Sequence, residues 1–262
     1  MTAAERQPKG QRFMRLLIIN PNISASVTEL IAAEARLAAA PQTEITMQTA
    51  PFGVAYIETR FEALIGAYAV AQVAAEHVEG HDAVIVAAFG DPGLAALREV
   101  MPVPVLGMTE SALASACLLG HRFSIIAISQ RIQAWYREEV ERHQLLGRLA
   151  SIRALEQHLA DIGQVQQDHE AALLALCERA VREDGAEVLI IAGAPLAGLA
   201  RKIKDRIGVP VVDGVSSAVQ HAQSLHALQP SKALTGSFAP PPRKLHQGLP
   251  PSLAALFDAL PC

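Results

Sequence analysis

Four residues that can hold or transfer a proton follow closely on segments that read as buried strands. They are Asp91, Thr109, Glu110 and Asp213. Carboxyl groups at such positions can remove a proton from a carbon beside a carbonyl group, or return one to it. The strand ends of open α/β sheets are also where ligands bind. The pattern therefore predicts proton transfer on a small carbonyl compound, provided that these side chains face one cleft.

These residues also have structural interpretations. Asp91 stands before Pro92, an order typical of a helix N-cap followed by its first turn. Glu110 opens a predicted helix, where a negative charge is favourable in itself. Asp213 ends a strand and is the best carboxylate candidate of its half of the chain. Catalytic and structural roles both stay open at this point.

A repeated segment suggests where the cleft lies. Each copy predicts a strand, a turn, a helix and a Val-Pro-Val strand, and the copies are 84–105 and 189–211. If they face each other across a pseudo-twofold axis, Ala88 and Gly193 occupy equivalent strand ends and look into one cleft. Neither residue carries a group that can move a proton.

Apolar runs of strand length alternate with longer helical patterns along the chain. The predicted strands are 16–19, 44–49, 83–88, 105–107, 123–128, 187–192 and 209–212. The predicted helices are 26–38, 58–77, 110–119, 132–143, 168–182, 216–225 and 251–260. Such alternation is typical of parallel βαβ units. We expect an α/β fold of two parallel-sheet lobes, with interleaved repeats near 84–120 and 189–225.

Composition narrows the class of protein. The chain has 262 residues, 51% of them hydrophobic, and a net charge of -4 without a basic stripe, which argues against nucleic-acid binding. Neither a signal-peptide pattern nor a long apolar span is evident, so we expect a cytoplasmic protein without a membrane partner. Residues 1–13 are polar and patternless and predict a disordered extension, with residues 14–262 forming the two-lobed domain.

Metal and nucleotide chemistry find little support in the sequence. Cys117, Cys177 and Cys262 show no CxxC or Cys/His spacing, and the nine histidines show no metal spacing. Glycine-rich nucleotide motifs are also missing. We therefore expect no metal and no cofactor.

Several motifs together resemble the hydantoin racemases of the aspartate/glutamate racemase superfamily. They are Asn20-Pro21-Asn22 after a strand, Phe89-Gly90-Asp91-Pro92-Gly93-Leu94, Leu119-Gly120-His121-Arg122-Phe123-Ser124, Glu183-Asp184-Gly185-Ala186 and Ala197-Gly198-Leu199-Ala200. The resemblance runs from Met14 to about Gln229. It implies two Rossmann-like lobes and an isomerase that works without cofactor through two cysteines, one in each lobe. Matched motif by motif, those cysteines fall on Ala88 and Gly193, so two-thiol racemisation is not expected here.

The remaining pocket can still bind a small carboxylate or a hydantoin-like compound. We expect backbone N–H groups around Phe89, Gly90 and Ala194 to favour carboxylate or enolate oxygens. The other candidate binding residues are Asn20, Pro21, Phe52, Ala88, Gly193 and Pro195. A capped turn is an equally good interpretation of Asn20-Pro21-Asn22. A role in the core or in a hinge is an equally good interpretation of Phe52.

Three functions remain open on the sequence. The first is a cofactor-independent racemase-family enzyme. The second is a lyase, decarboxylase or hydrolase that stabilises an enolate or oxyanion, and the third is a non-catalytic metabolite-binding protein. A carboxylate converging on the cleft favours an enzyme, whereas an apolar cleft with only backbone donors favours a binder. The resemblance also implies a homo-oligomer.

Overall fold

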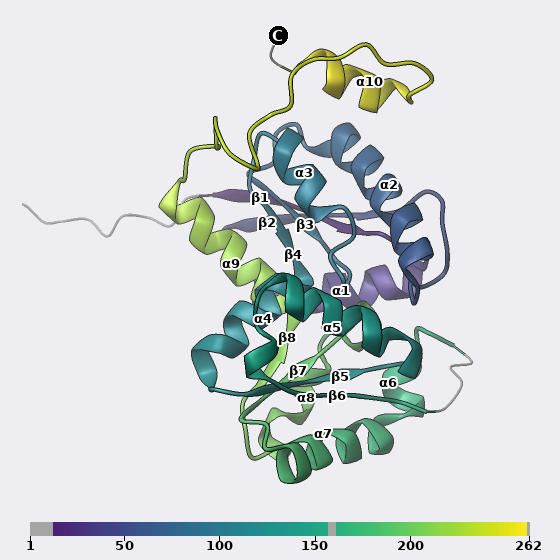
Figure 1. The fold of residues 1–262 in the computed structure, drawn as a ribbon, viewed down its shortest axis with the longest axis vertical. Coiled ribbons are helices and arrows are strands. Elements are labelled where there is room, and N and C mark those ends of the chain that lie inside the picture. Colours follow the sequence, from purple (N-terminus) through teal and green to yellow (C-terminus); the bar gives the residue numbers. More distant parts are fainter. Residues whose placement is uncertain (1–12, 157–160, 261–262) are drawn as a thin grey trace, which may run out of the picture.

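Two four-stranded parallel sheets form the frame of the molecule. The computed structural model describes residues 13–156 and 161–260. The first sheet has the order β2-β1-β3-β4, from Thr43–Thr49, Met14–Asn20, Ala83–Val86 and Val105–Gly107. The second has the order β6-β5-β7-β8, from Leu149–Ala154, Phe123–Ala127, Val188–Ile191 and Val211–Asp213. The identical strand order confirms the predicted pair of α/β lobes (Figure 1).

Helices cover both faces of the first sheet. Its central strands β1 and β3 are almost entirely buried, as expected for parallel strands packed on both sides. One core joins the sheet to α1 (Ala25–Ala38) and α9 (Gly214–Leu228). The other joins it to α2 (Arg60–His77) and α3 (Leu94–Val100). The central strands therefore present only their ends to a ligand.

The second sheet has its own core. It is packed by α4 (Met108–Leu119), α5 (Gln133–Arg142), α7 (Glu170–Asp184) and α8 (Leu199–Ile203). Phe89, from the first lobe, also belongs to this core. The lobes thus meet through packed side chains at the end of β3.

Two helices exchange partners between the lobes. Helix α4 follows β4 of the first sheet but also contacts β7 and β8 of the second. Helix α9 follows β8 of the second sheet and contacts β1, β3 and β4 of the first. The two helices also contact each other, where the lobes meet in Figure 1.

Most predicted elements are present, with differences that have physical reasons. Strand β6 was not predicted, because it is a half-exposed edge strand whose polar Ser151 and Arg153 bond to Asp184. The helix predicted over 168–182 is α7, shifted by two residues, and a short helix that was not predicted, α6 (Val165–Asp168), precedes it. Helix α10 (Pro251–Asp258), after the proline-rich segment, packs on α2. The predicted extension falls almost wholly on residues 1–12, which lie outside the described residues.

Candidate active site

Ala88 and Gly193 occupy matching places after β3 and β7. The backbone N–H of Ala87 donates to Ile19 O at 2.8 Å, and that of Ala192 donates to Ile126 O at 2.8 Å. In both lobes these bonds form at the residue after the strand ends, which is one residue before Ala88 and one residue before Gly193. The two turns are therefore structural counterparts in the two lobes.

The space beside Gly193 admits a Cβ at ordinary contact distance, but the Gly193 backbone is one that side chains rarely adopt. A Cβ built on Gly193 would meet only the Pro195 Cδ at 3.7 Å and the Tyr136 Oη at 3.8 Å within contact range. The residue has a φ of 104°, which glycine accepts and other residues adopt only under strain. This position therefore leaves room for a small group next to a phenol hydroxyl.

An aromatic cluster from α5 covers the turn at Ala88. Ala88 is 8% exposed and Phe89 3%. The Phe89 and Tyr136 ring centroids lie 4.6 Å apart. Trp135 packs so closely on Gly90 that a Cβ there would lie 2.2 Å from its Cζ2. Phe89 thus packs into the core of the second lobe while holding Tyr136 near Gly193.

Tyr136 is a candidate that the sequence reasoning missed. It is 2% exposed, and burial, followed by the charges of Asp91 and Glu58, raises the pKa of its hydroxyl. The phenol therefore stays protonated at neutral pH and can donate a hydrogen bond. The adjacent Trp135 and Tyr136, in a chain with only 4% aromatic residues, were the available signal.

Asp91 caps a helix, but not the helix that follows Pro92. Its carboxylate accepts from the backbone N–H of Thr109 at 2.8 Å and of Glu110 at 3.0 Å, in the first turn of α4. Helix α3 instead begins after Gly93 without a side-chain cap. The expectation that Asp91 caps the following helix was wrong, because the carboxylate fills the space over Gly107, where a Cβ would lie 2.2 Å from the Asp91 Cγ. Burial raises the pKa of Asp91 to about 7, against the lowering effect of the two N–H bonds.

Asp213 makes the corresponding bonds in the second lobe. Its Oδ1 accepts from the N–H groups of Val215 and Ser216 in the first turn of α9, at 2.8 and 3.0 Å, and its Oδ2 accepts from Gly198 N–H at 2.9 Å. Burial raises the pKa of Asp213 to about 6. The carboxylate also lines a cavity of about 170 Å³ with Glu34 and Arg201. Ala88 and Gly193 do not line this cavity.

Thr109 and Glu110 are likewise bound to their surroundings. Thr109 is fully buried, and its Oγ1 accepts from the Gly90 N–H at 2.6 Å. The Gly90 N–H is therefore already bonded within the protein, whereas we expected from the sequence that it binds a ligand. Glu110 forms an ion pair with Arg98 and accepts from Gly107 N–H at 3.2 Å. Asp91, Thr109, Glu110 and Asp213 thus hold the first turns of α4 and α9 and the strand-end loops in place.

The expected rim residues are also bound within the protein. The Asn20 Nδ2 donates to Asn22 Oδ1, Ser24 O and Thr28 Oγ1 at 3.0 to 3.2 Å. These bonds support the capped-turn interpretation of Asn20-Pro21-Asn22. The ring of Phe52 lies 5.8 Å from that of Tyr68, on α2.

Gln166, which was also missed, supports the second turn. Ala194, Pro195 and Leu196 form a 3-10 turn after Gly193. The Gln166 Nε2 donates to Pro195 O at 3.0 Å and to Ala197 O at 2.8 Å, and its Oε1 accepts from the Lys202 Nζ. Because Gln164 and Gln167 stand beside it in a polar stretch, the sequence offers no signal that singles out Gln166 for this role.

The described residues include two free cysteines, the half-buried Cys117 and the buried Cys177. That part of the chain contains no group of three or more His, Cys, Asp or Glu placed to hold a metal ion. Cys177 is buried, which raises the pKa of its thiol to about 12. In the same residues, no helix has the length and apolar character needed to cross a membrane.

Known proteins share this architecture. The family model described as Asp/Glu/Hydantoin racemase matches residues 16–222. The hydantoin racemase of Paenarthrobacter aurescens is 37% identical over 238 residues, which cover 88% of this chain and 99% of that protein. The crystal structure of allantoin racemase from Pseudomonas fluorescens is 38% identical, with a TM-score of 0.83 over 90% of this chain and 100% of that one. Allantoin racemase from Klebsiella pneumoniae is 34% identical, with a TM-score of 0.86 over 92% of this chain and 98% of that one.

The fold and the sequence matches define one class of protein. The chain belongs to the Asp/Glu/hydantoin racemase family. Within that family it is similar to hydantoin and allantoin racemases over most of its length. Arylmalonate decarboxylase, at 16% identity and a TM-score of 0.58, shares the fold.

Proposed function

We propose that the chain is a cofactor-independent enzyme that binds a hydantoin-like compound or a small carboxylate between Ala88 and Gly193. The observation that carries this proposal is the room beside Gly193, where a built Cβ would lie 3.8 Å from the Tyr136 Oη without a clash. A ligand oxygen placed there meets a protonated phenol in a buried setting, where a hydrogen bond to a developing negative charge is strongest. The names of the similar racemases supply the substrate class.

The geometry favours chemistry on one face of the substrate. Racemisation by two groups needs a proton carrier on each side of the reacting carbon. Here Tyr136 lies on the Gly193 side, while position 88 holds only a methyl group. An enolate or oxyanion, by contrast, needs donors toward its oxygen, and Tyr136 is one. The backbone N–H of Ala194, which donates to no acceptor within the described residues, is a second such donor. We therefore place a lyase, decarboxylase or hydrolase reaction ahead of racemisation.

A metabolite-binding protein without catalysis is the second candidate. Its support is that Asp91, Thr109, Glu110 and Asp213 are all bound to backbone groups or to a cation rather than converging between Ala88 and Gly193. In such a protein, ligand binding would change the contact between lobes that now includes the Arg60–Glu138 ion pair.

Proton NMR in deuterated water separates these functions. The intact protein is mixed with 5-substituted hydantoins, allantoin, amino acids and substituted malonates, and deuterium uptake and substrate loss are followed together. Consumption supports the one-face reaction, whereas exchange without consumption indicates a racemase that uses other acids and bases. Silence across the panel, combined with saturable binding in the same samples, supports the binding protein. Silence without binding contradicts both proposals.

A further inference from the structure

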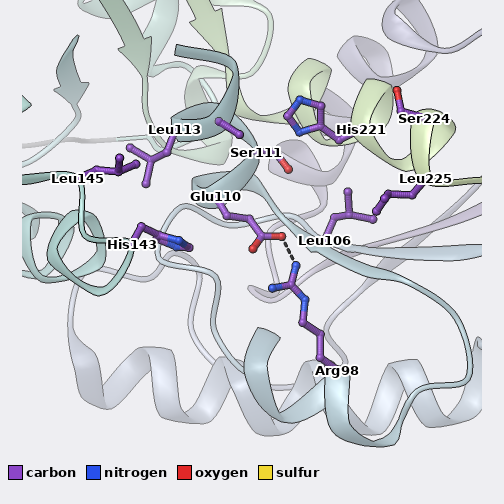
Figure 2. A pocket seen from close by; sticks show the side chains of 11 residues that line it. Arg98, Leu106, Glu110, Ser111, Leu113, His143, Leu145, His221, Ser224 and Leu225 are labelled. Carbon is purple, nitrogen blue, oxygen red and sulfur yellow. Dashed lines mark hydrogen bonds and ion pairs between the residues drawn. The ribbon is translucent and has the colours of Figure 1, made fainter. Parts of the chain in front are cut away.

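A second cavity lies where α3, α4 and α9 meet the end of α5, apart from the Ala88 and Gly193 turns. Its volume is about 460 Å³, within the range of small-molecule sites. The Leu106, Leu113 and Leu225 side chains form apolar walls around it (Figure 2). Neither Ala88, Gly193 nor Tyr136 lines it. This cavity is therefore distinct from the candidate active site.

A buried hydroxyl in its lining has no partner. Ser111 is 2% exposed, and its Oγ makes no hydrogen bond within the described residues. Buried polar groups are nearly always hydrogen-bonded, and each exception calls for an explanation. The side chain belongs to the cavity wall, as Figure 2 shows, so a small displacement of that wall would let a ligand there supply the missing partner. The hydroxyl can serve as donor or as acceptor.

The charged groups of the cavity cancel each other. Arg98 forms an ion pair with Glu110, and its Nε also donates to Val105 O at 2.9 Å. His143 faces the same space, and burial lowers the pKa of its ring despite the opposing effect of Glu110, which favours the neutral ring. His221, across the cavity, has its Nε2 3.4 Å from the Ser115 Oγ. A charged ligand would lack a free counter-ion here, while a neutral polar group would find both donors and acceptors.

We propose that this cavity is a second binding site, which takes a small neutral molecule with an apolar body and an amide-type or imide-type head. The apolar body packs against Leu106, Leu113 and Leu225. The head group, which offers both a carbonyl oxygen and an N–H, pairs with the Ser111 hydroxyl and the polar side of the cavity. The site does not depend on which reaction occurs between Ala88 and Gly193.

Benzamide tests this proposal, with benzoate and benzylamine as charged probes of the same body. Each is titrated into the intact, isotope-labelled protein while backbone amide shifts are recorded. Benzamide should give saturable shifts centred on α4 and α9, with a dissociation constant in the millimolar range that a probe of this size permits. The two charged probes should bind at least about tenfold more weakly, because desolvating an unpaired charge is costly.

Two variants locate the binding. Ala114→Trp places an indole at the cavity wall from an exposed helix position and should abolish the benzamide shifts. Leu118→Trp, also exposed on α4 but outside the cavity wall, should preserve them. Ser111→Ala should weaken benzamide binding about tenfold by removing one hydrogen bond, without lowering the melting temperature, because its hydroxyl has no partner in the protein.

Several results would overturn the proposal. They are the absence of saturable shifts, shifts centred on the Ala88 and Gly193 turns, benzoate binding as tight as that of benzamide, and benzamide binding that survives Ala114→Trp. An unchanged affinity in Ser111→Ala would show that the hydroxyl does not contact the head group, and would remove the basis for the assigned ligand class.

Discussion

The carboxylate of Asp91 occupies the place of a side chain at Gly107. A Cβ on Gly107 would lie 2.2 Å from the Asp91 Cγ. In the second repeat, the residue that corresponds to Gly107 is Asp213, whose own carboxylate accepts from the first-turn N–H groups of α9. In each lobe an aspartate thus accepts from the first-turn N–H groups of the exchanged helix, and the two aspartates come from different positions of the repeat.

These two carboxylates predict a pH-dependent stability. The folded protein raises the pKa of Asp91 from 3.8 to about 7 and that of Asp213 to about 6. Between 3.8 and these values the folded chain holds protons that the unfolded chain has lost. Their contribution to stability is therefore complete below the unfolded pKa and is lost as the pH rises through about 6 to 7.

Urea unfolding between about pH 4.5 and pH 8 measures this effect. Asp91→Asn should flatten the fall in unfolding free energy across the window. Asp258→Asn is the matched control, because hydrogen bonds from His246 and Arg243 lower the pKa of Asp258 and move its titration below the window. A profile for Asp91→Asn as steep as that of the parent protein would contradict the assignment.

Tyr136→Phe tests the phenol hydroxyl. The ring contact with Phe89 at 4.6 Å does not involve the hydroxyl, so the variant should keep the melting temperature within about 2 °C. On any substrate that the parent protein turns over, kcat should fall about 10²-fold, the effect of removing one oxyanion donor. Steady-state kinetics and calorimetry check the two parts. Parent-like kcat in the folded variant would exclude Tyr136 from the reaction.

Introducing thiols at positions 88 and 193 tests whether the cleft geometry still supports proton exchange by two cysteines. We expect no measurable α-proton exchange on 5-substituted hydantoins or allantoin in the parent protein. Combining Ala88→Cys with Gly193→Cys should produce partial exchange, because the built Cβ at Gly193 contacts nothing closer than 3.7 Å. The gain should come with a loss of about 1–3 kcal/mol of stability, caused by the positive φ at position 193.

The matched single variants are Ala88→Cys and Gly193→Ala. The first should be nearly neutral for stability, whereas the second should show the backbone strain without adding a thiol. Exchange that stays at the background level in the double variant would mean that the pocket has been remodelled beyond the two residues.

Gly90→Ala should destabilise the junction of the lobes strongly. The new methyl group would lie 2.2 Å from Trp135, and Gly90 has a φ of 108°. Strain and overpacking together predict a loss of about 2–6 kcal/mol in chemical unfolding. Gly208→Ala, where nothing lies within 4 Å of the built Cβ, is the control and should change stability little. Equal stabilities of the two variants would show that Trp135 yields at no cost.

The parallel sheets were predictable because their strands are continuous apolar runs between helical patterns. The placement of Ala88 and Gly193 at matching turns followed from the internal repeat. The partners of Asp91 could not be read from the sequence, because its bonds to Thr109 and Glu110 depend on how the β3 loop folds over Gly107. Tyr136 was missed for a related reason: it reaches the site from α5, outside the repeated segments.

The exchange of α4 and α9 has a consequence for how the chain can be divided. A single cut near Gly120 would give two fragments, each with one sheet and each retaining the helix that packs on the other fragment's sheet. Each piece alone would leave an apolar sheet face bare, whereas the two pieces together could restore both faces. We therefore expect the two lobes to fold and unfold as one cooperative unit.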